Sequence, residues 1–167
     1  MPVGDSAVVN QLRFADFDDQ ERAEWLARTL DAYARERSEA DSISYEEALA
    51  QAREHARDKF PGGVPAPGHQ TGYVIWDGEI VGELWIGPRT AGSRDWWVWN
   101  IEILPERRGS GLGRRTMRLA EDLAAANGAT SIGLNVFGHN VVARALYESL
   151  DYETTSVQMR KRLEPGQ

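Results

Sequence analysis

Apolar residues recur at helical spacing through the first third of the chain. After a short strand-like run over residues 8–14, this spacing predicts a helix over residues 17–37. Its apolar positions are Trp25, Leu26, Leu30 and Tyr33. Ser44 and Glu47 have the spacing of a capping box, in which each side chain hydrogen-bonds the backbone of the other residue. They predict a second helix that runs to about residue 59.

In the middle of the chain the apolar residues follow the two-residue period of β-strands. Proline and glycine residues over 61–68 interrupt regular structure. Residues 73–76 and 79–86 are strand-like on either side of Asp77-Gly78, a pair that favours a tight type I′ turn. A second turn precedes a longer strand over residues 95–104. The pattern therefore predicts three consecutive antiparallel strands.

Helices and strands alternate in the last third of the chain. We expect a helix over residues 111–127 that ends at Gly128, a strand over residues 131–136, a helix over residues 140–150 with Asn140 as its N-cap, and a final strand over residues 152–163. The whole order predicts a single mixed α/β domain over residues 1–167. Its mostly antiparallel sheet is flanked by about four helices.

Composition narrows the classes of function. The 167 residues are 41% hydrophobic, and no apolar run is long enough to cross a membrane. The first ten residues lack a basic stretch followed by an apolar core, so we expect a cytoplasmic protein. The absence of cysteine excludes disulfides, thiol catalysis and cysteine zinc sites. The net charge of −7 argues against nucleic-acid binding, and it serves either solubility or the attraction of a cationic amine.

One glycine-rich turn stands out between the predicted strand over residues 95–104 and the helix that follows. It reads Arg108-Gly109-Ser110-Gly111-Leu112-Gly113. The first backbone N–H groups of a helix have no partner within it and carry partial positive charge, and glycine lets the backbone approach a phosphate. Further positive charge comes from Arg107, Arg114 and Arg115. We therefore predict a pyrophosphate site rather than a plain tight turn.

A second segment completes the pattern. It holds Leu134-Asn135-Val136, then Asn140, Ala143, Leu146-Tyr147 and Asp151-Tyr152. Together with the run from Ile101 to Pro105 and the glycine turn, it resembles the GCN5-related N-acetyltransferase (GNAT) family over about residues 70–163. The resemblance implies the GNAT acyl-CoA N-acyltransferase fold, whose sheet splays at the cofactor site. Asp151 stands where the family has glycine, and we expect it to adopt the left-handed conformation.

The resemblance implies a role for each matching residue. Backbone amides from Arg108 to Arg114 would hold the CoA pyrophosphate, and the strand edge at Ile101 and Ile103 would pair with the pantetheine arm. Asn140 would contact that arm, and Tyr147 would act as general acid toward the sulfur. Asn135 and Ala143 complete the implied cofactor-binding set. The positions 140, 143 and 147 share one helix face.

The proton acceptor for the amine is a separate question. Ribosomal-protein acetyltransferases of the family carry a glutamate at the position of Asn135, whose amide cannot take a proton. Glu102 is the predicted base, because a partly buried carboxylate beside the cofactor strand would have a raised pKa. Ile101 and Ile103 would face the other side of the sheet. In the alternative, Glu102 only orients the amine and water is the base.

The resulting hypothesis is an acetyl-CoA-dependent N-acetyltransferase. It would move an acetyl group to a primary amine, on a small molecule or a peptide, by direct attack in a ternary complex and without a metal. The alternative is a non-catalytic acyl-CoA-binding or regulatory module on the same scaffold. A homodimer is a further expectation of the fold. The tryptophans are expected mostly in the core or on the sheet face, with a minority beside the acceptor.

Overall fold

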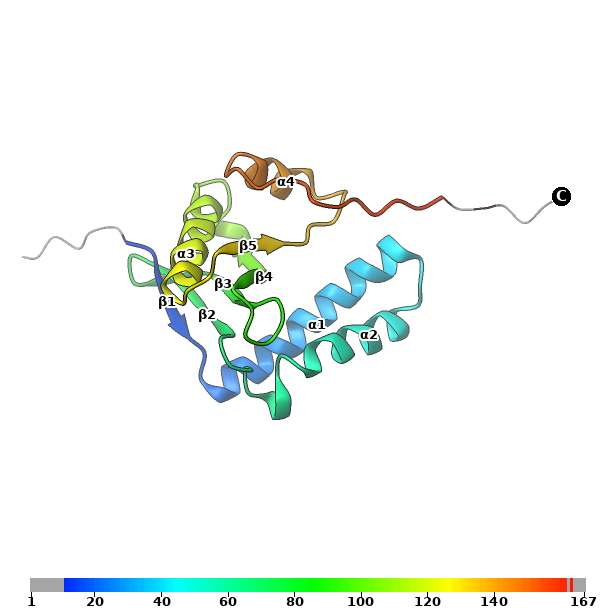
Figure 1. Cartoon of the computed structure of the whole chain (residues 1–167), viewed down its shortest axis with the longest axis horizontal. Helices are drawn as coiled ribbons and strands as arrows, with labels where there is room; N and C mark the ends of the chain where they lie inside the picture. Colours follow the sequence, from blue (N-terminus) through cyan, green and yellow to red (C-terminus); the bar gives the residue numbers. More distant parts are fainter. Residues whose placement is uncertain (1–10, 162, 164–167) are drawn as a thin grey trace, which may run out of the picture.

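A computed structural model describes residues 11–161 and residue 163, and it shows one sheet with helices on both faces (Figure 1). The strands are β1 (Arg13–Asp16), β2 (Gln70–Trp76), β3 (Glu79–Pro88), β4 (Asp95–Ile103) and β5 (Ser131–Leu134). The helices are α1 (Asp19–Asp41), α2 (Tyr45–Arg57), α3 (Leu112–Ala126) and α4 (Val141–Glu148). Short 3₁₀ turns cover Pro61–Gly63 and Pro105–Arg107. None of these helices is long and apolar enough to cross a membrane.

The sheet order is β1-β2-β3-β4-β5, with antiparallel neighbours except for the parallel pair β4 and β5. This confirms the mixed α/β class and the three consecutive antiparallel strands. The β2–β3 turn is the predicted one, since Asp77 and Gly78 both have positive φ, at 51° and 82°. The α3 helix that links β4 to β5 makes their parallel pairing possible.

Local signals set most helix boundaries. Ser44 accepts a hydrogen bond from the Glu47 amide (3.1 Å) and starts α2 as predicted, but the Glu47 side chain accepts from Gln51 and does not close the predicted capping box. The start of α1 comes from a capping box that the prediction missed, in which Asp18 and Glu21 cap each other's backbone. The helix then runs beyond residue 37 to Asp41, and Ser42 ends it in the left-handed conformation.

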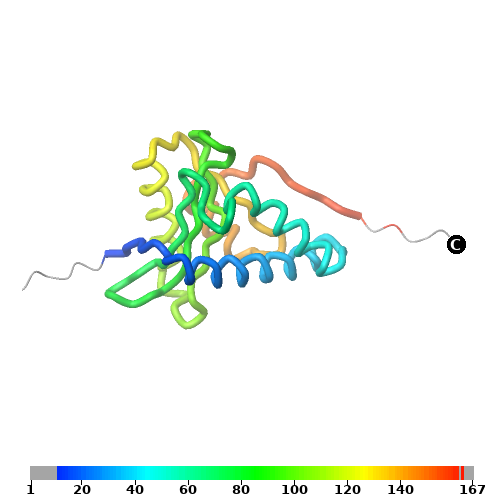
Figure 2. Tube along the Cα trace, turned by 90° about the horizontal axis from the view of Figure 1, so that it is seen from below, coloured from blue at the N-terminus to red at the C-terminus, as the bar shows by residue number. Residues whose placement is uncertain are grey.

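Two clusters of buried side chains cover the two faces of the sheet. On the α3 face, Leu84 and Ile86 of β3 pack with Met117 of α3. On the other face, Trp25 of α1 packs against Trp85, with ring centroids 5.7 Å apart. Successive residues of a strand point to opposite faces, so Leu84 and Trp85 belong to different clusters. In Figure 2 the sheet lies between α3 and the pair α1 and α2.

The main differences from the prediction concern the first strand and the last two strands along the chain. Residues 8–10 of the predicted first strand lie outside the described residues, and β1 begins at Arg13. The predicted strand over 131–136 ends at Leu134. The predicted final strand is wrong: residues 153–161 form no strand and run outward, exposed, beyond α4 (Figure 1). Alternation marks a segment that is able to pair, but a strand also needs a neighbouring edge, and the segment leads away from β5.

A histidine is held neutral on the α1 face. The Trp85 Nε1–H donates to Nδ1 of His69 (3.1 Å), so the ring proton of the neutral form lies on Nε2. Burial, helped by the nearby charge of Lys59, lowers the pKa of His69 from 6.5 to about 4. The unfolded chain therefore binds more protons than the folded chain between these two values.

This difference predicts an acid-sensitive fold. The contribution of His69 is fully present above pH 6.5 and is lost as the pH falls toward 4. The glutamine in His69→Gln can still accept from Trp85 but does not titrate. We therefore expect the fall in the free energy of unfolding across this pH window to be smaller in the variant, by up to about 3 kcal/mol. Urea titrations at several pH values measure it. An unchanged pH slope in the variant would contradict the assignment.

Candidate functional site

The glycine turn presents unpartnered backbone amides. It follows the 3₁₀ turn Pro105–Arg107, and Gly109 and Gly111 have φ of 77° and 80°. Gly111 is the N-cap of α3 and offers no side-chain cap. Among the described residues, the amides of 109–114 donate to no backbone acceptor. Cβ atoms added at Gly109 and Gly111 would project into open space. A helix N-terminus with these features is suited to hold an anion.

Arginines surround a hollow of about 280 Å³ beside this turn. Its lining includes Trp76, Arg107, Arg108, Ser110, Leu112 and Arg115. Arg115 lies over the Trp76 ring (4.8 Å to the centroid), and Arg107 is paired with Glu79. Arg108 donates to the Ile103 carbonyl (2.8 Å). The predicted basic cluster is therefore fixed around the turn by contacts that keep each guanidinium near it.

The strand that leads to the turn has an open edge. β5 pairs with β4 only from Asp95 to Val98, and within the part of the chain that the structure describes, no other strand pairs with β4 on that side up to Ile103. In the β3–β4 ladder, Trp85 pairs with Asn100 and Ile86 pairs with Val98, so Trp99 of β4 is an extra, bulged residue. The bulge lies at the point where β4 separates from β5. The expected splay is present. The unpaired segment is a template for an added extended chain.

The second segment lies against the first. The Leu146 side chain of α4 comes within 3.3 Å of where a Cβ on Gly113 would be, and Arg114 donates to the Ser149 hydroxyl (2.6 Å). Asn140 caps α4 by accepting from the Ala143 amide (3.1 Å), as expected. Small size at position 113 thus lets the two helices approach closely.

Tyr147 lies inward on α4. It packs against the α3-face core, its ring is 6.0 Å from that of Tyr152, and burial raises the pKa of its phenol. The phenol is therefore protonated at neutral pH. Asp151 has φ of 65° and ends the helix in the predicted left-handed conformation. The exposed Asn135 follows β5 directly.

The carboxylates differ from the expectation. The Glu102 side chain is 54% exposed and lies 3.8 Å from Arg108, so it lacks the burial that the prediction assumed. Its direct neighbour across the strands is Glu83, which is only 16% exposed and bonds Arg28 of α1 (2.9 Å). Burial raises the pKa of Glu83 against the opposing charge of Arg28, and Glu102 raises it further. The predicted neighbours Ile101 and Ile103 do pack on the opposite face.

An aromatic row borders the place where the strands part. Trp85 and Trp99 stack with centroids 5.6 Å apart, and Trp97 lies next to Trp99 (6.2 Å). Lys59 covers the Trp99 ring at 4.3 Å, and Arg89 covers the Trp97 ring at 4.4 Å. The faces of these two rings are therefore already occupied by cations of the protein.

The comparisons with known proteins agree with this geometry. A sequence model of the Acetyltransferase (GNAT) family matches residues 26–152. The chain belongs to the GNAT family. This GNAT chain is 27% identical over 150 residues to YycN of Bacillus subtilis strain 168, named as an uncharacterized N-acetyltransferase, covering 86% of this chain and 94% of YycN. YdgE of the same strain, also named as an uncharacterized N-acetyltransferase, is 23% identical and covers 89% and 96%.

Solved structures extend the comparison. A crystal structure of YycN matches with a TM-score of 0.83 and 25% identity, over 93% of this chain and all of that one. AAC(6')-Iy, in complex with the bisubstrate analogue CoA-S-monomethyl-acetylneamine, matches with a TM-score of 0.55 over 93% and 99% of the two chains. At 13% identity this second likeness shows the GNAT fold alone.

The amide cluster predicts a sharp effect of one substitution. Gly111→Glu adds a side chain and a negative charge where the amides are open, so we expect it to abolish the rise in Tm that CoA produces in the parent protein. Gly92→Glu is the matched control, because Gly92 also has positive φ (74°) and open space but lies in a distant turn. A CoA-dependent rise retained in Gly111→Glu would place the phosphate site elsewhere.

Proposed function

We propose that this GNAT chain transfers the acetyl group of acetyl-CoA to a primary amine by direct attack in a ternary complex. The observation that carries the proposal is the open amide cluster at the start of α3, directly after the unpaired edge of β4; the inward Tyr147 of α4 supports it. The amides suit a pyrophosphate, the edge suits an extended amide-bearing arm, and the phenol suits a leaving thiolate.

The donor is held mostly by backbone. The amides of residues 109–114 bind the pyrophosphate, and Arg107, Arg108 and Arg115 shield its charge. The pantetheine arm lies along the edge at Ile101 and Ile103 as an added strand. Asn140 keeps its Oδ1 on the α4 cap, which leaves its Nδ2 group to donate to an amide carbonyl of that arm. Asn135, directly after β5, and Ala143 of α4 complete the proposed donor site.

The transfer needs three groups of the protein: a donor to the developing oxyanion, an acid for the sulfur and a base for the amine. The neutral amine forms a C–N bond to the acetyl carbon, and a backbone N–H at the Trp99 bulge donates to the oxygen that becomes negative. The C–S bond then breaks, and Tyr147 gives its proton to the departing sulfur. The amine's surplus proton passes to a carboxylate. No covalent bond to the protein forms.

Glu83 is our choice for that carboxylate. Its burial beside Glu102 favours the protonated form more than an exposed position would, which brings its pKa toward the working pH of a general base. Glu102, which the sequence favoured as base, adds negative charge on the same face and attracts the ammonium form of the acceptor. The acceptor class is a small-molecule or peptide amine.

Tyr147 gives the first kinetic prediction. Tyr147→Phe removes only the hydroxyl, so we expect kcat to fall about 10²-fold with little change in the Kd for acetyl-CoA. An amine panel with a thiol-release assay measures it. Tyr152→Phe is the matched control: its ring neighbours that of Tyr147, but its hydroxyl donates to Glu121 (3.1 Å) and has no role in the proposed reaction, so kcat should persist. Equal kcat in the parent and Tyr147→Phe would remove Tyr147 from the mechanism.

The carboxylates of Glu83 and Glu102 give the second kinetic prediction. The basic form of Glu83 is lost as the pH falls through its raised pKa, so kcat/KM should drop on the acid side. Glu83→Gln should abolish that limb and lower kcat about 10²-fold. Glu102→Gln should keep the limb but move it to lower pH, because the neighbouring negative charge is gone. Loss of the limb in Glu102→Gln alone would return the role of base to Glu102.

A further inference from the structure

One lysine lies beside the bulge at which the proposed acetyl transfer takes place. Lys59 comes two residues after the end of α2, and its Nζ lies 4.3 Å from the centroid of the Trp99 ring. A single methylene joins that ring to the backbone at the bulge, where an N–H is the proposed donor to the oxyanion. The chain has 19 lysine and arginine residues, but only Lys59 and Lys161 are lysines. Of these two residue types, lysine is the one whose amine can lose its proton and attack an acyl group.

The surroundings of Lys59 favour the neutral amine. Its side chain is half-buried, and its Nζ donates to the His55 carbonyl (2.8 Å). Within the described part of the chain, no carboxylate forms an ion pair with it. Burial lowers the pKa of Lys59, although the charge of Asp58 opposes this effect. A larger fraction of Lys59 is therefore neutral at a given pH than of an exposed lysine, and only the neutral amine is a nucleophile.

The proposed base lies on the same face of the sheet as this amine. Glu83 and Trp85 are two residues apart on β3 and therefore point to one face. Trp99 stacks on Trp85 with ring centroids 5.6 Å apart, so the ring that Lys59 covers belongs to this face as well. The flexible four-carbon stem of lysine lets its nitrogen move from the ring toward the β4 edge without a change in the backbone. An amine and a proposed base therefore share the α1 face beside the bulge.

We propose that Lys59 is an internal acceptor, which takes the acetyl group of bound acetyl-CoA when no amine substrate is present. The inference rests on the proposed acetyl transfer. The neutral Nζ forms a C–N bond to the acetyl carbon, the C–S bond breaks, and Tyr147 gives its proton to the sulfur. The surplus proton of Nζ passes to Glu83 and returns through solvent to the Tyr147 phenolate. The products are CoA and a chain in which Lys59 is acetylated on Nζ and has lost its positive charge.

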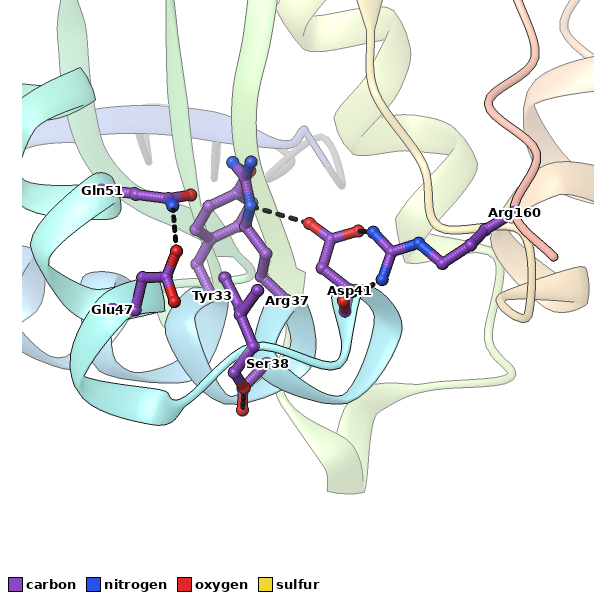
Figure 3. A network of polar contacts seen from close by, with 8 residues as sticks. Tyr33, Arg37, Ser38, Asp41, Glu47, Gln51 and Arg160 are labelled. Atoms are coloured by element: carbon purple, nitrogen blue, oxygen red, sulfur yellow. Dashed lines mark hydrogen bonds and ion pairs between the residues drawn. The ribbon is translucent and has the colours of Figure 1, made fainter. Parts of the chain in front are cut away.

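The second lysine is an internal control. Lys161 is exposed and directly follows Arg160, which donates to Asp41 at the end of α1 (2.9 Å). Figure 3 shows this contact and the ion pair of Asp41 with Arg37. Because α2 returns along α1 from this end (Figure 1), the 13 residues of α2, about 20 Å, separate Asp41 from Lys59. Acetyl-CoA that reacts directly from solution reaches Lys161 freely, whereas transfer within the site reaches only Lys59.

Mass spectrometry of the intact protein tests the proposal. Deacetylase-treated protein is incubated with saturating acetyl-CoA and no amine. It should gain one acetyl group per chain, which peptide mapping should place on Lys59. Lys59→Arg should stay unmodified, and Lys161→Arg should be modified at the parent rate. Arginine keeps the positive charge over the Trp99 ring, so circular dichroism should show an unchanged fold. Because one chain holds both donor and acceptor, the first-order rate should not change when the protein is diluted.

Variants of the donor site separate catalysis from chemical acetylation. Tyr147→Phe should slow the modification of Lys59 about 10²-fold. Gly111→Glu should prevent it, whereas Gly92→Glu should behave as the parent protein does. Equal modification of Lys59 and Lys161, or full modification of Lys59 in Gly111→Glu, would overturn the proposal.

The parent protein separates this inference from the function on which it rests. A parent that leaves Lys59 unmodified overturns the internal acceptor. If the same parent acetylates an amine of the panel, the proposed acetyl transfer stands without it. If the parent neither binds acetyl-CoA nor acetylates any amine, the proposed function is wrong, and the internal acceptor is wrong with it.

Discussion

The parting of β4 from β5 is the feature on which the rest of the site depends. It begins at the bulge at Trp99, directly after the last β4–β5 pair of Val98 and Leu134. The extra residue also reverses the alternation of β4, so that Trp96 and Val98 share the α3 face with Ile101 and Ile103. One bulge therefore opens a strand edge for a ligand and turns Glu102 toward Glu83 on the opposite face.

Electrostatics divides the site into two ends. The chain has a net charge of −7, but the start of α3 gathers arginines and free amides around a glycine turn, which suits phosphate. The carboxylates Glu83 and Glu102 lie together on the α1 face, which suits a cationic amine. In the proposed reaction each end would attract a substrate of opposite charge, and the open β4 edge would join them. This separation would let an acidic protein bind a polyanionic donor.

Local chemistry made much of this predictable from sequence. Glycine, serine and aspartate fix turns and caps through nearby backbone, so the Asp77-Gly78 turn, the Ser44 and Asn140 caps and left-handed Asp151 were all expected correctly. The pairing of Glu83 with Glu102 was missed because the bulge at Trp99 shifts the register of β4 against β3, and no residue type in the sequence indicates a bulge at this position. The prediction of a final strand was wrong because an alternating pattern describes only one strand, and a sheet also needs a neighbouring strand with which it can pair.

The central claim is that the α3 amides and the β4 edge form an acyl-CoA site, and calorimetric titration tests it most directly. Purified protein is titrated with acetyl-CoA, with desulfo-CoA and with NAD, which also carries a pyrophosphate. The account predicts micromolar binding of acetyl-CoA and of desulfo-CoA, which retains the pyrophosphate and most of the pantetheine arm, and no comparable heat with NAD. Equal binding of NAD, or no binding of either CoA compound, would contradict it.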